Sequence, residues 1–491
     1  MTIIFLDPYL VRDISEYTDL RELYNTCSSL FKNKKNINYK LNRQYSLMYY
    51  NDVQFRNRVL EKIMNPQKHL HLNLNFYNEI IDVSMLGNVH TLVLSRCNKI
   101  TNIKALKNIN TLNLSYCNQI INVSPLKNVY KLNLQSCDKI TDVSALSKVN
   151  TLNLCRCYNI SDISALGNVY SLNLSFCNNV TNVSALTNVY KLILRGCKNI
   201  SDVSALGNVN ILDLSSCENI TDVSALTNVY ELNLTGCKNI TNVNALKNTN
   251  TLNLSFCDKI KDVRALGKVH SLNLSYCNNI EDVSALGNVN NLNLSYCNKI
   301  TNVSSLGNVH TLDLSYCNNV TNVRELGKNH TLHLVYCKNI INVSSLGNVH
   351  TLDLSFCDKI TDVSKLGKVN TLNLSFCYNI RDVSALGNVH NLNLRSCNKI
   401  TNVSSLGKVH NLNLSSCTNI MDVSSLENVH NLDLSFCDKI TDVSKLENVH
   451  NLILNGCKNI CSLTNANANA NVLSSKMRIV SFRNIYTRTI S

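Results

Sequence analysis

The sequence predicts an elongated solenoid, in which short coils stack and share one parallel β-sheet. Three observations lead to this prediction. A frame of 20 residues recurs from residue 71 to about residue 460, and apolar residues occupy the same seven positions in each copy. Twenty residues leave room for a strand and tight turns but for no long helix. Because a repeat array grows along one axis, the 491 residues need not be divided into several globular domains.

Each copy begins with a short alternating segment, such as TLNLS. Leu112 and Leu114 point to one face of such a strand, whereas Thr111, Asn113 and Ser115 point to the other. Leucine recurs at the second and fourth positions of every copy. The alternation predicts a short strand at the start of each coil, and stacking of the coils makes these strands parallel neighbours.

After the strand, apolar residues occur at every third position. In the same copy they are Cys117, Ile120, Val123, Leu126 and Val129. This spacing predicts tight turns with about one turn of 3-10 backbone on the side opposite the sheet.

A cysteine occupies the seventh position in nineteen copies, from Cys97 to Cys457. Neighbouring thiols lie about 4.7–4.9 Å apart and point the same way, which disfavours disulfides between them. Zinc sites need converging ligands, often as Cys-x-x-Cys, and the closest pair here is only Cys155 with Cys157. We therefore interpret the thiols as small buried groups that donate weakly to carbonyls, and we expect no metal and no cofactor.

Three polar columns accompany the strands. Histidine precedes the strand at His90, His270, His310, His330, His350, His390, His410, His430 and His450. No carboxylate column is placed to orient these rings toward a metal, so we interpret them as a polar ladder at the sheet edge. A second column, of Asn and Asp at the third position of most copies, points outward from the strand and either serves recognition or forms a hydrogen-bonded ladder. Asx at the twelfth position, such as Asp142, is expected to cap the turn that follows it.

The position before the cysteine is aromatic in seven consecutive copies. These residues are Phe256, Tyr276, Tyr296, Tyr316, Tyr336, Phe356 and Phe376. They either anchor a protein partner or form a stacked ladder that joins the coils, and the sequence leaves both open. One copy departs from the frame, with His333 for Asx, Val335 for Ser and Asn329 for Val. We include His333 among the candidate partner-binding residues.

The pattern L-x-L-x-x-C-x-x-I, followed by V-x-x-L, resembles the cysteine-containing leucine-rich repeat over residues 71–460. The segment ISDVSALGNV, residues 200–209, is similar to the short repeats of bacterial surface proteins. The resemblance implies a solenoid of the α/β horseshoe class, with the sheet on its concave side and short turns or 3-10 segments on its convex side. In that frame the aromatic column lies exposed at the concave rim. Tyr77 replaces cysteine in the first copy, as capping repeats often do.

Residues 1–68 lie outside the period and predict a small helical head. Apolar residues recur there at helical spacing, among them Leu10, Ile14, Leu20, Leu23 and Phe31. The order of Pro8, I-x-x-Y and D-L-x-x-L-x-x-T-C-x-x-L-F resembles an F-box, although the usual Leu-Pro pair is missing and Thr26 stands where an apolar residue is expected. The resemblance implies that these five residues bind a cullin-ligase adaptor. The alternative is a plain helical cap on the first coil.

Charge excludes a phosphate-tracking surface on the repeats. Of the net charge of +14, the head and the tail together carry about +8, which leaves about +6 over some 390 repeat residues. We therefore expect no nucleic acid. No apolar run is long enough for a membrane helix, and the start lacks the basic region of a secretory signal, so we expect no membrane and a reducing, cytoplasmic location.

The sequence predicts a non-catalytic protein-protein interaction protein. Nothing in it resembles a nucleophile with its base, a phosphate loop or a paired-carboxylate site. A head similar to an F-box followed by these repeats resembles the substrate-recognition subunits of cullin-RING ubiquitin ligases. The alternative is a leucine-rich-repeat binding or structural protein with no ubiquitin link. The composition is also similar to repeat proteins of giant viruses, which would place the chain in the host cytoplasm. Residues 461–491 are expected to be a low-complexity linker and a cap or tail.

Overall fold

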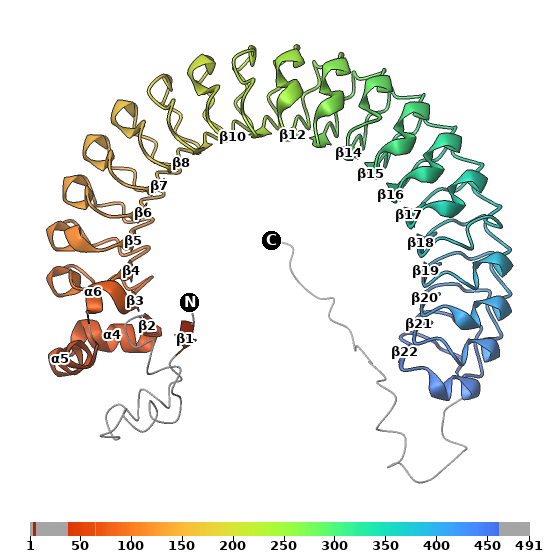
Figure 1. Ribbon diagram of the computed structural model, residues 1–491. Coiled ribbons are helices and arrows are strands. Elements are labelled where there is room, and N and C mark those ends of the chain that lie inside the picture. Colours follow the sequence, from red (N-terminus) through yellow and green to blue (C-terminus); the bar gives the residue numbers. More distant parts are fainter. Residues whose placement is uncertain (1–2, 6–37, 64, 461–491) are drawn as a thin grey trace, which may run out of the picture. The chain divides into compact units, whose positions relative to one another are not determined.

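The computed structural model describes residues 3–5, 38–63 and 65–460. The chain divides into two compact units, which we call unit 1 (residues 1–239) and unit 2 (residues 240–491). Each unit is a stack of short coils, with its strands side by side on one face and its 3-10 turns on the other (Figure 1). The predicted coil, with a strand followed by tight turns, is confirmed.

The described strands of unit 1 are β1 (Ile3–Phe5), β2 (Asn38–Lys40), β3 (Leu70–Asn73), β4 (Thr91–Val93), β5 (Thr111–Asn113), β6 (Lys131–Asn133), β7 (Thr151–Asn153), β8 (Ser171–Asn173), β9 (Lys191–Ile193), β10 (Ile211–Asp213) and β11 (Glu231–Asn233). The described strands of unit 2 are β12 (Thr251–Asn253), β13 (Ser271–Asn273), β14 (Asn291–Asn293), β15 (Thr311–Asp313), β16 (Thr331–His333), β17 (Thr351–Asp353), β18 (Thr371–Asn373), β19 (Asn391–Asn393), β20 (Asn411–Asn413), β21 (Asn431–Asp433) and β22 (Asn451–Ile453).

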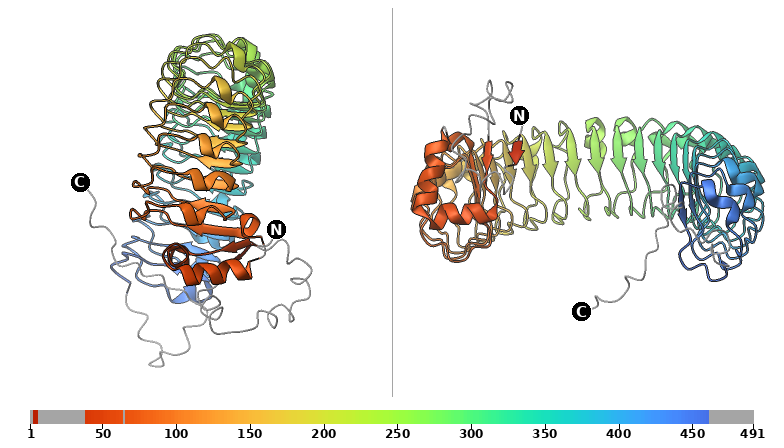
Figure 2. Two further views of the ribbon diagram at one scale, coloured as in Figure 1. Left: turned by 90° about the vertical axis from the view of Figure 1, so that its left-hand side faces the viewer. Right: turned by 90° about the horizontal axis from the view of Figure 1, so that it is seen from below.

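The strands pair in parallel and in register, so that each residue lies beside its equivalent in the next coil. Leu292, for example, pairs with Leu272 on one side and with Leu312 on the other. The backbone bonds continue past the strand: the Leu274 N–H donates to the Asn293 carbonyl at 2.8 Å, and the Tyr276 N–H to the Ser295 carbonyl at 2.9 Å. The right-hand view of Figure 2 shows the resulting row of parallel strands.

The apolar columns form the interior of each unit. In the coil that starts at Thr311, the side chains of Leu312, Leu314 and Cys317 are all 0% exposed. The equivalent positions of the other coils are buried too, except Tyr77, Leu454 and Cys457 in the first and last coils. Burial of a leucine of this kind contributes roughly 1.5–3 kcal/mol. The predicted core is therefore confirmed, and it extends along the coil axis because no coil can bury its leucines alone.

The cysteine ladder is part of this core. All twenty described cysteines are free, and all but Cys155 and Cys457 are buried. The Cys317 thiol donates to the Leu294 carbonyl of the preceding coil at 3.1 Å, and burial raises its pKa to about 12. A thiol held protonated, buried and bonded to a carbonyl is a poor nucleophile, so the ladder serves packing, as predicted.

Asx residues at the twelfth position shape the turns opposite the sheet. The Ser304 N–H donates to Asn302 Oδ1 at 3.0 Å, and the Ser364 N–H to Asp362 Oδ1 at 2.9 Å. The 3-10 segments follow directly, as at Ser304–Asn308. The acceptor bonds the N–H two residues later, which makes each of these an Asx-turn. The predicted structural role of this column is confirmed.

The head continues the sheet instead of standing apart from it. β2 pairs in parallel with both β1 and β3, and it is followed by α4 (Arg43–Asn51), α5 (Val53–Lys62) and α6 (Pro66–His69). Asn42 and Asp52 cap α4 and α5 by accepting N–H bonds. Tyr50 of α4 meets Tyr77 of the first coil edge to face, at 6.2 Å between ring centroids. Residues 38–69 therefore cover the end of unit 1.

The nineteenth position of the 20-residue frame is Val in most coils of unit 2, but two polar residues interrupt this column. Thr249 and Asn329 are each 1% exposed. Asn329 Nδ2 donates to the carbonyls of Leu306, at 2.9 Å, and of Val309. Its Oδ1 has no partner among the described residues, and neither does Thr249 Oγ1. Each position therefore carries a desolvated oxygen that valine would not have.

Replacing Asn329 by Val should stabilise the protein, by about 1 kcal/mol, because it removes a buried acceptor that has no donor. The measurement is the free energy of unfolding of the full chain in denaturant. Asn348→Val, a change of the same kind at an exposed site, serves as the control and should stay within about 0.5 kcal/mol of the parent. A loss of stability in Asn329→Val would show that its two donor bonds outweigh the unpaired oxygen.

The Asx-turns should make the protein sensitive to acid. Hydrogen bonds from the serine two residues later, backbone N–H first, lower the pKa of Asp362, Asp382, Asp422 and Asp442. A carboxylate whose pKa is lowered by folding stabilises the fold above its unfolded pKa, and this contribution is lost as pH falls through the folded pKa. The melting temperature should therefore fall below about pH 4.

A variant in which these four aspartates are changed to Asn tests this explanation. Between pH 5 and pH 3, a range of about two units around the carboxyl pKa, its melting temperature should fall by less than that of the parent. An amide accepts the same N–H bond without titrating. The control is Glu427→Gln with Glu447→Gln, two exposed acids with no hydrogen bond among the described residues. Equal acid profiles for both variants would contradict this explanation.

Candidate protein-binding surface of unit 2

The aromatic residues of unit 2 follow their strands and stack along the coil axis. Ring centroids are 4.3 Å apart for Phe256 and Tyr276, and 4.2 Å apart for Tyr276 and Tyr296. They are 4.2 Å apart for Tyr296 and Tyr316 and 4.8 Å apart for Tyr316 and Tyr336. The spacing is close to that of parallel strands. We call these five rings, with Phe356 and Phe376, the aromatic ladder.

The backbone at the ladder position is left-handed. Tyr316 has φ 63°, and every equivalent residue of the array has positive φ, with glycine at Gly196, Gly236 and Gly456. A non-glycine residue costs roughly 1–2 kcal/mol there. A stacked pair of rings returns about 0.5–1.5 kcal/mol, so stacking offsets much of the strain. Phe436 has no ring in the next coil and lies over a glycine instead: a Cβ on Gly456 would stand 2.5 Å from the Phe436 ring.

Stacking leaves ring edges and hydroxyl groups at the surface. Phe256, at the start of the ladder, is 44% exposed, while the six rings that follow are half-buried. A hydrogen bond with the Tyr276 hydroxyl is the main cause that raises the pKa of Tyr296. The ladder therefore presents a row of phenol oxygens above apolar rings, which suits a surface that is partly apolar and partly hydrogen-bonding.

The ladder is broken once, after Tyr336. The rings of Tyr336 and Phe356 are 6.1 Å apart and inclined by 52°, whereas Phe356 and Phe376 stack again at 4.3 Å. Lys338 Nζ lies 4.2 Å from the centroid of the Tyr336 ring, and its hydrogen bond to the Tyr336 side chain raises the pKa of Lys338. The break thus coincides with a cation beside the ladder, and a second cation, the Arg395 guanidinium, lies 5.7 Å from the Phe376 ring at the last coil of the ladder.

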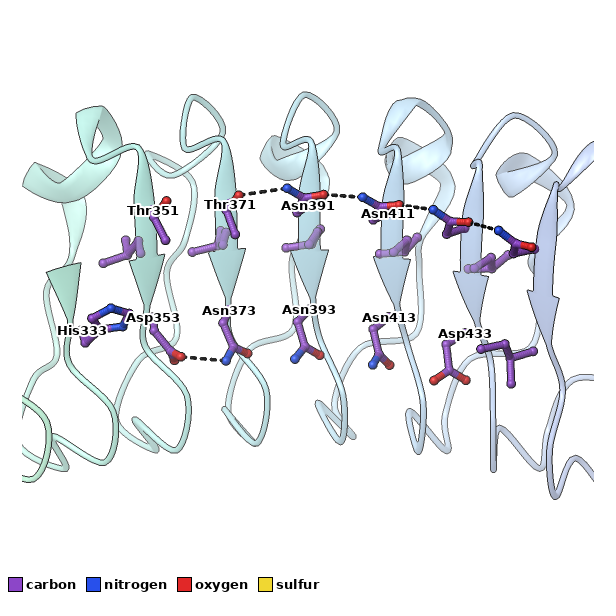
Figure 3. A pocket seen from close by; sticks show the side chains of 18 residues that line it. His333, Thr351, Asp353, Thr371, Asn373, Asn391, Asn393, Asn411, Asn413 and Asp433 are labelled. Atoms are coloured by element: carbon purple, nitrogen blue, oxygen red, sulfur yellow. Dashed lines mark hydrogen bonds between the residues drawn. The ribbon is translucent and has the colours of Figure 1, made fainter. Parts of the chain in front are cut away.

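A groove of about 800 Å³ lies on the outward face of β16 to β22. Figure 3 shows its two rows of polar side chains, which come from the first and third residues of each strand. In one row, Asn391 Nδ2 donates to Thr371 Oγ1 at 2.9 Å, and the amides of Asn411, Asn431 and Asn451 continue the chain, each bonded to the one before.

The other row contains the charges of the groove. Asp353 Oδ2 accepts a bond from Asn373 Nδ2 at 3.0 Å (Figure 3), and Asp433 lies toward the other end. His333 pairs in register with Asp313 on one side and Asp353 on the other. No lysine or arginine lines the groove, so its surface is neutral to acidic.

Histidine stacks border the groove. The rings of His390, His410, His430 and His450 follow one another at 4.6–4.7 Å between centroids and are nearly parallel. Burial, followed by the neighbouring rings, lowers the pKa of His430. Parallel rings do not converge on one point, and the described part of the chain holds no group of three side chains that could bind a metal. These rings form the polar ladder that the sequence predicts.

The structure brings part of the predicted site together. His333 opens the groove, and the last three rings of the aromatic ladder, Tyr336, Phe356 and Phe376, follow its strands β16 to β18. The other four rings follow β12 to β15, on the coils before the groove. Leu10, Ile14, Leu20, Leu23 and Phe31 lie outside the described residues. The amide row of Asn391, Asn411, Asn431 and Asn451 was not predicted as part of a site. Its signal was in the sequence, because asparagine replaces threonine at the first strand position in these four consecutive coils.

No family model and no curated protein match the sequence. Among solved structures, the RP105/MD-1 complex of mouse is similar with a TM-score of 0.50 at 16% identity, over 79% of this chain and 78% of that one. An internalin (inlF) of Listeria monocytogenes has a TM-score of 0.35 at 23% identity, over 69% of this chain and 90% of its own.

The functional domain of InlJ from Listeria monocytogenes, described as including a cysteine ladder, has a TM-score of 0.39 at 22% identity, over 60% of this chain and 71% of that chain. At 16% identity, the similarity to the mouse complex, with its TM-score of 0.50, shows the fold alone. With the coil geometry above, the fold class is confirmed as a leucine-rich-repeat solenoid. No helix in the described ranges is both long and apolar enough to cross a membrane.

Proposed function

We propose that this chain is a non-catalytic interaction protein that holds a protein partner on unit 2. The observation that carries the proposal is the groove of about 800 Å³ on β16 to β22, which the aromatic ladder of β12 to β18 overlaps at β16 to β18. Tyrosine and other aromatic residues are enriched at the centres of protein interfaces. The surface therefore combines anchors with hydrogen-bonding groups.

The chemistry of the groove favours a peptide segment. Asn391, Asn411 and Asn431 each use one donor and one acceptor on their neighbours, and Asn451 uses one donor. Each amide therefore keeps one N–H for a ligand. These free donors repeat once per strand, so the carbonyl groups of an extended peptide lying across the strands can accept their hydrogen bonds. Asp353 and Asp433 carry negative charge without a basic residue among the lining groups, so a segment with lysine or arginine fits better than an acidic one.

We further propose that the head docks an adaptor of a cullin-RING ubiquitin ligase, which would make the chain a substrate-recognition subunit in the cytoplasm of a cell or host. The support is the resemblance of residues 8–31 to an F-box. The alternative, a repeat protein that binds its partner with no ubiquitin link, is supported by the way residues 38–69 cover the first coil, since a plain cap needs no adaptor.

Tyr316→Ala tests the ladder as a binding surface. If Tyr316 is an anchor, the affinity of the full chain for its purified partner should fall about thirtyfold. The melting temperature should also fall, because Tyr296 and Tyr336 each lose a stacked neighbour. The control is Tyr170→Ala, which removes one ring of the stacked pair Tyr170 and Tyr190 in unit 1 and should leave affinity unchanged. A lower melting temperature with unchanged affinity would rule out the ladder as the site.

Leu20→Asp with Leu23→Asp tests the head. Charges at two positions of the matched motif should abolish co-purification of the adaptor with the full chain, because an apolar contact cannot accept unpaired carboxylates. Lys34→Asp, just outside the motif, is the control and should retain the adaptor. If the parent chain captures no adaptor, or the double variant captures it as well as the parent does, the alternative without a ubiquitin link is the better description.

A further inference from the structure

Unit 1 carries a basic surface on its strands. We call it the basic face, and it consists of the first, third, fifth and sixth residues of the coils that begin with β4 to β9. These six strands pair side by side and in register. The basic face holds five basic residues and no acidic one. The five, all of them exposed, are Arg96, Lys131, Arg156, Lys191 and Arg195.

The described part of the chain does not neutralise these five cations. The ion pairs found there are Lys99 with Glu79, Arg264 with Asp262, Lys299 with Glu281 and Lys458 with Asp438. None of the five takes part. Instead, the Arg96 guanidinium lies 5.1 and 4.8 Å from the centroids of the Phe76 and Tyr116 rings, and that of Arg156 lies 5.4 Å from Phe176. A ring holds a guanidinium in place and leaves its charge uncancelled.

Two of the guanidinium groups act on the same part of the face. Burial raises the pKa of the Cys155 thiol, and the charges of Arg156 and Arg195 oppose this rise. Arg156 follows β7 and Arg195 follows β9, two strand spacings or about 10 Å apart. An anion above β8, the strand between them, therefore interacts with both charges.

The asparagines of the middle strands add hydrogen-bond donors. Asn153 Oδ1 accepts the Cys155 N–H at 3.0 Å, and Asn173 Oδ1 accepts the Ser175 N–H at 2.9 Å. The asparagines of β5 and β6 make the same bond. Because the backbone N–H needs an acceptor, this bond fixes the oxygen inward and the Nδ2 group away from it. Those Nδ2 groups have no acceptor among the described residues, so they remain free to donate to a ligand.

The chemistry of the basic face calls for a ligand that accepts hydrogen bonds and carries negative charge. A carboxylate has both properties, since it has no proton to donate. β6 to β9 cover three strand spacings, or about 14 Å, and an extended peptide rises about 3.3 Å per residue. Four or five residues of an extended chain therefore cross the part of the face that contains Lys131, Arg156, Lys191 and Arg195.

We propose that the basic face of unit 1 binds an acidic peptide segment of a protein partner. Carboxylates above β8 pair with Arg156 and Arg195, and the free amide groups of Asn153 and Asn173 donate to the same ligand. The face ends at β10, where Asp213 stands in the asparagine column beside Ile193. This site goes beyond the groove of unit 2, whose acidic lining favours a segment of the opposite charge.

A nucleic acid fits the same face less well. Lys131 and Lys191 are separated in register by the uncharged Thr151 and Ser171. The cations thus form no continuous row, whereas a nucleic-acid backbone presents closely spaced phosphates along its whole length.

Two variants with the same substitution test the proposal. β8 and β13 have the same sequence, SLN, and both asparagines accept the N–H of the serine two residues later at 2.9 Å. Asn173→Asp keeps this bond, as Asp213 does at the equivalent position, but replaces an outward donor by a negative charge. Asn273→Asp makes the same change in unit 2 and is the control.

The probe is a fluorescein-labelled peptide of about eight glutamates, enough to cross the face. Its affinity for the full chain is measured by fluorescence anisotropy. Asn173→Asp should weaken binding at least about tenfold, because a like charge is placed beside the carboxylates of the ligand. Asn273→Asp should stay within about twofold of the parent, since it leaves the face unchanged.

Removing the two guanidinium groups provides a second readout. Arg156→Gln with Arg195→Gln should also weaken binding about tenfold and should flatten its dependence on salt, because fewer charges are screened. The control is Lys104→Gln with Lys107→Gln, which removes the same charge from the exposed 3-10 segment η3 (Lys104–Asn108) and should bind as the parent does. The melting temperature of each variant verifies that it is folded.

The proposal is overturned if the parent does not bind the peptide at about 50 mM salt, where screening is weak. It is also overturned if the variants of the basic face and their controls weaken binding equally, because the net charge of the chain would then attract the peptide without a site. Tighter binding of a single-stranded oligonucleotide of the same length, lost in the same variants, would replace the acidic peptide by a nucleic acid and overturn it too.

Discussion

Hydrogen bonds between neighbouring coils, made in register at every 20th residue, are the constraint on which the rest of the structure depends. They place each side chain one strand spacing from its own equivalent, as Leu292 lies beside Leu272 and Leu312. Whatever residue type occupies a position must therefore be able to stack on itself. Leucine and cysteine do so in the interior, and asparagine, histidine and tyrosine do so at the surface, where amides chain and rings lie face to face.

Charges obey the same constraint. On the outward face of the described strands, no two like charges are neighbours: Asp313 and Asp353 are separated by His333, and Asp433 lies between Asn413 and Ile453. On the side of the turns, Asp362 is followed one coil later by Asp382. There each carboxylate accepts an N–H bond and solvent screens the pair. On the strand face, a charged residue therefore has a neutral or an oppositely charged residue beside it rather than a like charge.

The sequence predicted what repeats and missed what departs from the repeat. The interior columns, the cysteine ladder and the Asx-turns follow from spacing alone, because every copy of the repeat carries the same pattern and predicts the same local structure. The left-handed backbone before each cysteine was not predicted, although glycine at Gly196, Gly236 and Gly456 signals it among bulkier residues. β2 has no 20-residue frame and joins the sheet through its pairing with β3, a contact between segments that local patterns do not encode. The extent of the groove depends on side-chain bonds between coils, which spacing cannot supply.

A uniform array has no means of fixing where along its length a partner binds, because a partner shifted by one coil would meet the same groups. A unique position needs coils that differ from their neighbours. The coil that contains β16 differs most: His333 interrupts the Asx row, Lys338 accompanies the break after Tyr336, and Asn329 lies in the buried column just before it. The groove begins at this coil. The residues that depart most from the repeat thus coincide with the start of the surface best suited to binding, and they could set the register of a bound segment in a way that the repeated columns cannot.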